Sequence, residues 1–416
     1  MSDILSHGRD REPRGRRWLL AVVAVGIAVA LAAAFIWYLP GLRHHGGRTQ
    51  PGAVGSSPAA QGTPGSPTAA SSQLPRKPAP MTGQPLPRDA SVWLLLGGHE
   101  PAWLSVATGR AEPIGGLPQS DNGYQLIRIA GGWAAQPFPA DDVWCGDNCA
   151  TGPLPVYYVA DGSRVASRIG AADLTAPAAT PGALWLVSYR RGADMSTAVG
   201  NAQEVSVTGA TLQPRLRLPA GYVIDQGTRG GLLLVPAVAG SSPVSYELWD
   251  PGTRRVTRSF ADLIAASPTE IAWTPGCTAS CRVHVLDLPG GRVDEISLPG
   301  RSTALDGAFS PDGRLLALLV TAKVTAAGRA AATRLMVATV ASGRITAVPG
   351  TAVRSGNGVA FGWQAGSHRL IADVALDTTS QPHWQIAVWQ PGDARLSTAL
   401  ARVPDESWPV IGQGPY

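Results

Sequence analysis

The sequence predicts an all-β fold, a seven-bladed β-propeller, preceded by a single transmembrane helix and a disordered linker. Three features lead to this prediction: a long apolar run near the N-terminus, a following stretch rich in Pro, Gly and Ser, and then repeating units of short β-type runs separated by turns. The chain has 416 residues, of which 44% are hydrophobic and 15% charged. It therefore has enough apolar material for a large core.

The apolar run covers Trp18–Leu39, about 22 residues without a charge. At about 1.5 Å per residue, a helix of this length spans a hydrocarbon core near 30 Å. Trp37 and Tyr38 at one end and Trp18 at the other suit the two membrane interfaces, and Pro40 ends the run. We therefore predict that this run is a transmembrane helix.

The charges around the run predict its orientation. The basic tail, residues 1–17, carries five arginines, whereas only Arg43 and Arg48 follow the run closely. By the positive-inside tendency the tail is cytoplasmic and the rest is exported, as in a single-pass protein of the cell membrane. The alternative is a cleaved signal peptide, for which Ala32–Ala34 offers small residues, but the run is longer than the 7–15 residues of a signal core. Both interpretations make the body of the chain extracytoplasmic.

Residues 40–90 form the predicted linker. This stretch is rich in Gly, Pro, Ser, Ala, Thr and Gln and has almost no apolar periodicity. Burial therefore cannot offset the entropy of ordering it. Its Pro content predicts a partly extended stalk between the membrane and the propeller domain, residues 91–416.

The 4 cysteines form two local pairs, Cys145 with Cys149 and Cys277 with Cys281. An even number of cysteines in an exported protein favours disulfides, and we predict one within each pair. The alternative is a four-thiolate metal site, but such sites usually have tighter spacings, and these pairs lie about three repeats apart. A redox role is disfavoured because the reactive motif has two intervening residues. We predict no cofactor and no metal site.

Tight polar turns mark the repeats after Arg88. They recur at intervals of roughly 40–50 residues, and one wider gap requires a further unit with a degenerate turn at Thr208-Gly209. The glycines of these turns are Gly109, Gly162, Gly252, Gly291, Gly343 and Gly392. Four-stranded units of this period are propeller blades, because such sheets bury both faces only against neighbours in a ring. The seven predicted blades are residues 91–118, 124–170, 173–219, 222–265, 266–300, 301–350 and 351–403.

The first predicted blade is one strand short. We predict that Ser407–Gly412 supplies its missing innermost strand. The two ends of the propeller would then close the ring together and leave no sheet edge open inside it.

One segment resembles a known repeat. Residues 307–318 read GAFSPDGRLLAL, in which Ser310, Pro311, Asp312 and Gly313 are suited to the turn between the first two strands of a blade. The segment is similar to the F-S-P-D-G-R-x-L-A signature of WD40-like (PD40) repeats in bacterial TolB-type propellers. The resemblance implies a scaffold that binds partner proteins at one propeller face. The chain departs from TolB because it lacks a separate N-terminal α/β domain and has a membrane segment. Its Ala, Gly and Pro content looks like that of a high-GC actinobacterial protein.

The chemistry-bearing residues show no catalytic pattern. The 7 histidines lack metal-binding spacings, and no nucleophile elbow or phosphate-binding loop is present. We expect most of the 13 tryptophans to pack between blades, with stacking of a glycan or peptide at the channel mouth as the alternative for a few. Much of the net charge of +5 comes from the N-terminal arginines, so nucleic acid is not an expected partner.

We therefore expect a membrane-anchored, non-enzymatic binding or scaffold module that docks a protein or cell-envelope ligand at one propeller face. The alternative is an exported propeller enzyme, a lyase or hydrolase that acts on a glycan or lactone. An enzyme would gather acids, histidines or a metal at the mouth of the central channel, whereas a binding module would present an apolar or aromatic patch there.

Overall fold

The computed structural model describes residues 81–139, 150–238, 244–275, 281–322, 332–354, 359–364, 368–376, 383–404 and 407–411. The chain divides into two compact units, residues 1–76 and 77–416, and all described residues belong to the second. The predicted helix Trp18–Leu39 lies outside the described residues. Within the described residues, no helix has the length and apolar character needed to cross a membrane.

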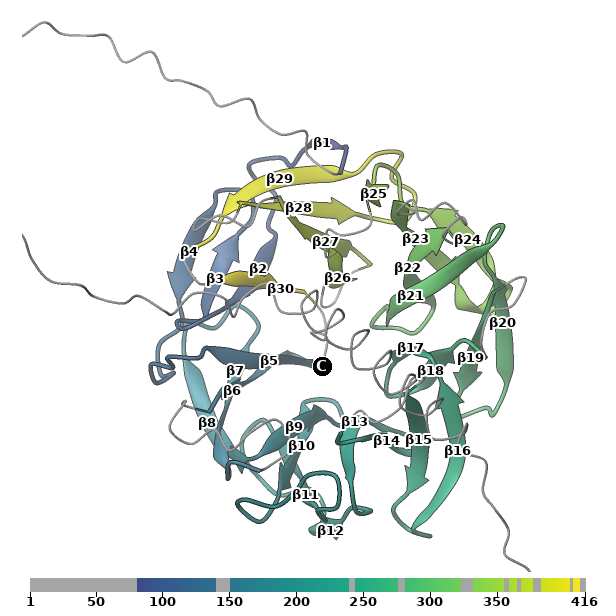
Figure 1. The fold of residues 1–416 in the computed structure, drawn as a ribbon. Coiled ribbons are helices and arrows are strands. Elements are labelled where there is room, and N and C mark those ends of the chain that lie inside the picture. Colours follow the sequence, from purple (N-terminus) through teal and green to yellow (C-terminus); the bar gives the residue numbers. More distant parts are fainter. Residues whose placement is uncertain are drawn as a thin grey trace, which may run out of the picture. The chain divides into compact units, whose positions relative to one another are not determined.

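The second unit is a β-propeller of seven blades arranged in a ring (Figure 1). Blades 1 to 4, from the innermost strand outward, are β30 (Trp408–Val410), β2 (Trp93–Gly97), β3 (Ala102–Ser105) and β4 (Arg110–Pro113); β5 (Tyr124–Ile129), β6 (Gly132–Pro137), β7 (Leu154–Ala160) and β8 (Ala166–Ala172); β9 (Leu174–Pro177), β10 (Ala183–Ser188), β11 (Asn201–Ser206) and β12 (Leu216–Arg217); β13 (Tyr222–Thr228), β14 (Gly231–Pro236), β15 (Ser245–Asp250) and β16 (Arg255–Ala261).

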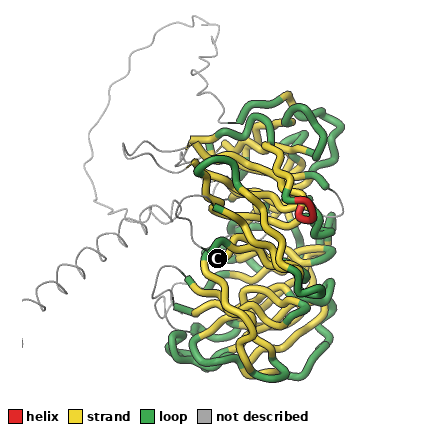
Figure 2. The backbone as a smooth tube through the Cα atoms, turned by 90° about the vertical axis from the view of Figure 1, so that its right-hand side faces the viewer, coloured by secondary structure: helices red, strands yellow, loops and turns green. Residues whose placement is uncertain are grey.

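Blades 5 to 7 follow the same pattern. They are β17 (Leu263–Ala266), β18 (Glu270–Trp273), β19 (Arg282–Asp287) and β20 (Val293–Ser297); β21 (Ser302–Phe309), β22 (Leu315–Ala322), β23 (Ala332–Thr339) and β24 (Arg344–Ala347), with β25 (Val353–Arg354) also on β23; β26 (Val359–Trp363), β27 (Leu370–Ala375), β28 (His383–Trp389), β29 (Ser397–Arg402) and β1 (Gln84–Pro85). Among the described residues the one helix is the short η2 (Val340–Ser342), drawn in red in Figure 2.

The predicted blade number is confirmed, and several predicted boundaries shift: β8 ends at Ala172 rather than at residue 170, β25 pairs with blade 6 although it lies in the predicted blade 7, and the start of blade 5 moves. Leu263–Ala266 is the innermost strand of blade 5 and pairs with β18, whereas the sequence placed residues 263–265 at the end of blade 4. The positive-φ bend at Asp262, with φ of 49°, separates this strand from β16. The apolar run therefore continues past the real junction between the two blades.

The predicted ring closure is also confirmed. β30, close to the C-terminus, pairs antiparallel with β2, so that Leu95 faces Val410 and Gly97 faces Trp408. Val410 and Leu95 share a core cluster with Tyr124 of blade 2. The closing strand β30 therefore completes the sheet of blade 1 and also packs against blade 2.

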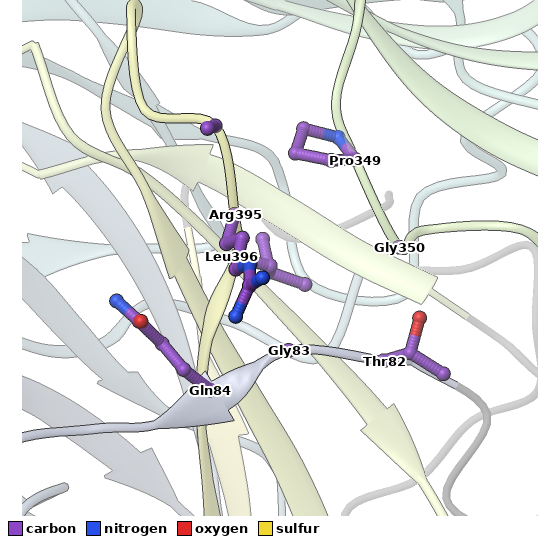
Figure 3. A pocket seen from close by; sticks show the side chains of 8 residues that line it. Thr82, Gly83, Gln84, Pro349, Gly350, Arg395 and Leu396 are labelled. Carbon is purple, nitrogen blue, oxygen red and sulfur yellow. The ribbon is translucent and has the colours of Figure 1, made fainter.

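The propeller begins earlier than Ser91, the predicted start. Met81 is buried, its backbone exchanges two hydrogen bonds with the Gln385 side chain at 2.9 and 2.7 Å, and β1 pairs in parallel with β29. This segment also lines a shallow depression on the rim between blades 6 and 7, together with Pro349 and Arg395 (Figure 3). The last ten residues of the predicted linker are thus part of the structured unit, held by backbone hydrogen bonds that a polar, periodicity-free sequence does not reveal.

The Ser-Pro-Asp-Gly segment forms the turn between β21 and β22. The Ser310 hydroxyl donates to Asp312 at 2.7 Å and accepts the Leu315 N–H at 2.9 Å, and Gly313 takes a φ of 71°. In the predicted turn at Gly252 the positive φ falls on Arg254, with φ of 57°, and not on the glycine. There the Asp250 carboxylate accepts the Gly252 N–H at 2.9 Å, and the Asp250 carbonyl accepts the Arg254 N–H at 2.8 Å.

The core lies between successive blades. Trp103, Trp133, Trp185, Trp249 and Trp389 are each at most 6% exposed, as predicted for most of the tryptophans. Trp93 and Trp408 are about 40% exposed, at 40% and 39%. Trp408 begins the innermost strand of blade 1, so its indole is one of the large apolar side chains that remain in reach of solvent.

One acid is buried at the junction between blades 7 and 1. Asp373 of β27 is 1% exposed, and its Oδ2 has no hydrogen-bond partner. Its neighbours Ile371 and Ile386 belong to the core cluster that contains Leu96 of blade 1. Burial raises the pKa of Asp373 to about 8, although the Ala360 N–H donates to the carboxylate and opposes the shift.

We predict that Asp373→Asn flattens the pH dependence of stability. The raised pKa means that the native state keeps a proton that the unfolded chain loses, so the free energy of unfolding falls by about 1.4 kcal/mol per pH unit between about pH 4 and 8. Thermal unfolding of the full-length protein at pH 5 and pH 8 gives the difference in Tm between the variant and the wild type. This difference should shift in favour of the variant at the higher pH. Asp121→Asn, at an exposed position, is the control, and an equal gap at both pH values would contradict the prediction.

Candidate functional site

The two cysteine pairs occupy equivalent connections of the propeller. Cys145 and Cys149 lie in sequence between the second and third strands of blade 2, and Cys277 and Cys281 lie in the same place in blade 5. Cys281 is disulfide-bonded and its Sγ lies 3.5 Å from Thr303 Oγ1. The other three cysteines lie outside the described residues, so the pairing stays a prediction. We call the edge of the ring at which the second strands end and the third strands begin the loop face.

Beside this edge, blade 5 presents a row of four side chains. The register places Leu263, Trp273, His284 and Glu295 opposite one another on β17, β18, β19 and β20. Residues directly opposite on neighbouring strands share a sheet face. The Trp273 and His284 rings accordingly lie 5.4 Å apart, tilted by 31°, and His284 Nδ1 lies 3.9 Å from Glu295 Oε1.

Blade 4 supplies the opposing wall. The Phe260 ring meets Trp273 edge to face at a centroid distance of 5.1 Å, and the Arg258 guanidinium lies 5.9 Å from the centre of the Trp273 ring. Tyr246 faces Phe260 across β15 and β16 and is half-buried in the same cluster. We call the group Asp225, Tyr246, Phe260, Trp273 and His284 the seam.

Asp225 occupies the inner end of the seam. It is the extra residue of a β-bulge in β13, between the paired Ile224 and Gln226. A bulge redirects a side chain that would otherwise follow the alternation of the strand. Burial raises the pKa of Asp225 to about 6, and its negative charge contributes to the raised pKa of Tyr246. The described residues offer the Asp225 carboxylate no hydrogen-bond donor.

The seam is thus an incompletely buried contact between blades 4 and 5, with a carboxylate at its inner end that has no partner among the described residues. Its core of fully buried apolar residues has only five members, fewer than any other cluster among the described residues. Tyr246, Trp273 and His284 remain partly exposed. A group that reaches these partly exposed side chains can donate hydrogen bonds to Asp225 and contact the aromatic rings beside it.

A second acid on an innermost strand has a different environment. Asp306 of β21 follows the bulge residue Leu305, which is 52% exposed. The Gly307 N–H donates to Asp306 Oδ1 at 2.7 Å, so this carboxylate already has a partner. Protein around Asp306 raises its pKa, and the Gly307 hydrogen bond opposes the shift. Asp306 therefore serves as a comparison for Asp225.

The sequence alone does not identify the seam. The tryptophans and histidines were considered only as groups, and nothing in the spacing of Trp273 and His284 shows that pairing across β18 and β19 brings them together. Asp225 was not singled out. A lone acid between Ile224 and Gln226, in a run that otherwise reads as a strand, is the signal that was available. Within the part of the chain that the structure describes, no three His, Cys, Asp or Glu side chains are grouped so as to hold a metal ion.

No protein-family model and no curated protein matches the sequence. Several solved structures are similar to this one. TolB from Acinetobacter baumannii matches with 11% identity over 67% of this chain and 66% of that chain, at a TM-score of 0.35. An acylaminoacyl peptidase in complex with Z-Gly-Gly-Phe-chloromethyl ketone matches with 10% identity, 74% and 48% coverage and a TM-score of 0.46.

The β-propeller domain of the Trilobed protease from Pyrococcus furiosus matches with 8% identity, over 70% of this chain and 98% of that domain, at a TM-score of 0.40. This chain spans just under two thirds of the TolB chain and about half of the peptidase chain, at 66% and 48%. The assignment of a propeller rests on the strand order of the seven sheets.

Proposed function

We propose that this protein is a membrane-anchored, extracytoplasmic binding module that takes a protein or cell-envelope ligand at the loop face, in the seam between blades 4 and 5. The observation that carries the proposal is the Asp225 carboxylate, which is only partly exposed, has no hydrogen-bond donor among the described residues and lies beside Tyr246. A carboxylate that the protein partly desolvates without supplying a partner is costly, so a ligand that supplies the partner recovers free energy on binding. The Ser310–Gly313 turn supports placing the repeats in the WD40-like (PD40) class.

The chemistry of the seam favours a ligand with an ammonium or guanidinium group. A cation satisfies Asp225 by charge as well as by hydrogen bonds, and aromatic rings attract cations through their negative faces. The protein's own Arg258 illustrates the second interaction, because its guanidinium lies over Trp273 at the outer end. A lysine or arginine side chain from an extended partner segment fits both features.

The proposal is non-enzymatic because the imidazole of the seam is directed toward Glu295 and not toward Asp225. His284 Nδ1 lies toward Glu295 on the outermost strand of blade 5, and Glu295 Oε2 accepts from Arg282 Nη1 at 2.5 Å. Asp225 belongs to the innermost strand of blade 4. General acid–base catalysis needs such groups to converge on one reacting atom.

The ligand class is tested with two small probes that differ in charge. We predict that the full-length protein in detergent binds N-acetyl-arginine amide in preference to the neutral isostere N-acetyl-citrulline amide, measured by ligand-observed NMR. Ionised Asp225 is required, so binding should be full at pH 7.5 and should weaken below about pH 6. Asp225→Asn should abolish the preference for arginine.

Asp306→Asn is the matched control, because that carboxylate also lies on an innermost strand but already has a donor. It should leave the preference for arginine intact. Equal binding of the two probes to the wild type, or a preference that survives Asp225→Asn, would overturn the proposed site.

The anchoring is tested separately. We predict that the intact mass of the full-length protein shows no alkylated cysteine without reductant and four with it, and that Met1 or Ser2 is retained. This outcome is expected if Cys145–Cys149 and Cys277–Cys281 are disulfides of an exported, anchored protein. Free thiols would contradict the export of the propeller, and a mature N-terminus near Phe35 would show a secreted protein without an anchor.

A further inference from the structure

The two ends of the seam carry opposite charges. Asp225 lies at the inner end, on β13, and Arg258 lies beside the outer end, on β16 of the same blade. Arg258 is exposed, and its guanidinium lies 5.9 Å from the centre of the Trp273 ring of the neighbouring blade. A ligand that crosses the seam would therefore meet a negative group at one end and a positive group at the other.

The charge of Arg258 is not neutralised within the part of the chain that the structure describes, where no carboxylate forms an ion pair with it. The two acids on the outermost strand of blade 5 have other partners: Glu295 accepts from Arg282 at 2.5 Å, and Asp294 pairs with Arg292 at 2.8 Å. The face of a guanidinium can lie on an aromatic ring while its N–H groups donate to a carboxylate. Arg258 can therefore keep its contact with the indole and bind an anion at the same time.

The register of blade 4 gives the distance between the two charges. Gln226, next to Asp225, is in line with Leu233, Leu248 and Arg258 across the four strands of the blade. Three steps of about 4.8 Å between neighbouring strands place the two ends about 14 Å apart. An extended chain rises about 3.3 Å per residue, so it covers this distance in about four residues. A small zwitterion is too short to reach both ends.

Protection of the sheet edge explains an arginine on β16 but not its position. Outer strands expose unpaired backbone groups, and charged side chains on them discourage association with other sheets. Any exposed position on the strand serves that purpose. Arg258 instead lies opposite Leu248, a member of the core cluster between blades 4 and 5, and its guanidinium reaches the aromatic ring of blade 5.

We infer that the ligand of the seam is an extended segment of a partner protein in which an aspartate or glutamate lies about four residues from the lysine or arginine. The inference rests on the proposed function and adds a second anchor to it. The basic side chain lies at Asp225, and the segment crosses the partly exposed rings of Tyr246 and Trp273. The acidic side chain pairs with Arg258, which makes this arginine a specificity-determining residue. The order of the charges directs the basic end of the segment toward the central channel.

The test compares acetylated and amidated peptides in both chain directions, RSSSE and ESSSR, each beside its counterpart with glutamine in place of glutamate. We predict that one of the two glutamate peptides binds the full-length protein in detergent about fivefold more tightly than its counterpart, the value of a favourable exposed ion pair. Ligand-observed NMR at pH 7.5 measures the binding. Arg258→Gln should remove this difference and retain the preference for arginine over citrulline. The peptide RESSS, whose charges are adjacent, should gain nothing from its glutamate.

Arg344→Gln is the matched control, because it removes an exposed arginine from the outermost strand of blade 6 and should leave the preference for glutamate intact. No preference for glutamate in either direction, with arginine still preferred over citrulline, would overturn the inference and leave the proposed site standing. A preference that survives Arg258→Gln, or one of equal size in RESSS, would also overturn it. If arginine itself is not preferred, Asp225 fails as the inner anchor, and the proposed site and the inference fall together.

Discussion

Closure of the ring is the constraint on which the rest of the structure depends. A four-stranded sheet that is apolar on both faces is stable only with a neighbour on each side, and seven blades meet that condition only if the last one contacts the first. The hydrogen bonds between β30 and β2 satisfy it, because they bring Val410 against Leu95 in the core between blades 1 and 2. β1 on the outside of β29 and Met81 at Gln385 fasten the other end of the propeller to blade 7. Both ends of the unit are therefore held in place by adjacent blades.

A closed ring also decides where a binding site can form. Contacts between most blades are filled with apolar side chains, so there is little room for a ligand except at places where the packing changes. Between blades 4 and 5 it changes in two ways: the bulge in β13 turns Asp225 out of the alternation, and aromatic rings take the place of aliphatic side chains around Trp273. The rigid strands on either side hold these groups in place. This combination of a fixed scaffold with one unsatisfied charge is what a selective binding site requires.

Much of the fold follows from the sequence because the second and third strands of each blade are covered on both faces. Runs such as Leu315–Val320 or Ala183–Val187 are apolar throughout, and the period of the turns between such strands gave the number of blades. The outer strands are harder to predict, since β16 has six exposed residues out of seven and no apolar pattern. Several innermost strands, such as β9 and β17, are short and rich in small residues, so they carry little periodic signal. The seam could not be predicted because it depends on register between strands and on a bulge, and neither leaves a regular mark in a single sequence.

Hydrogen exchange of the full-length protein, followed by mass spectrometry, tests the closure of the ring most directly. If β30 completes blade 1, the amides of residues 408–411 and those of β2 exchange slowly and at the same rate, because both are lost only when the ring opens. The account predicts that common rate. Exchange of residues 408–411 within seconds, while β2 stays protected, would show that the C-terminal strand does not close the ring and would contradict the account.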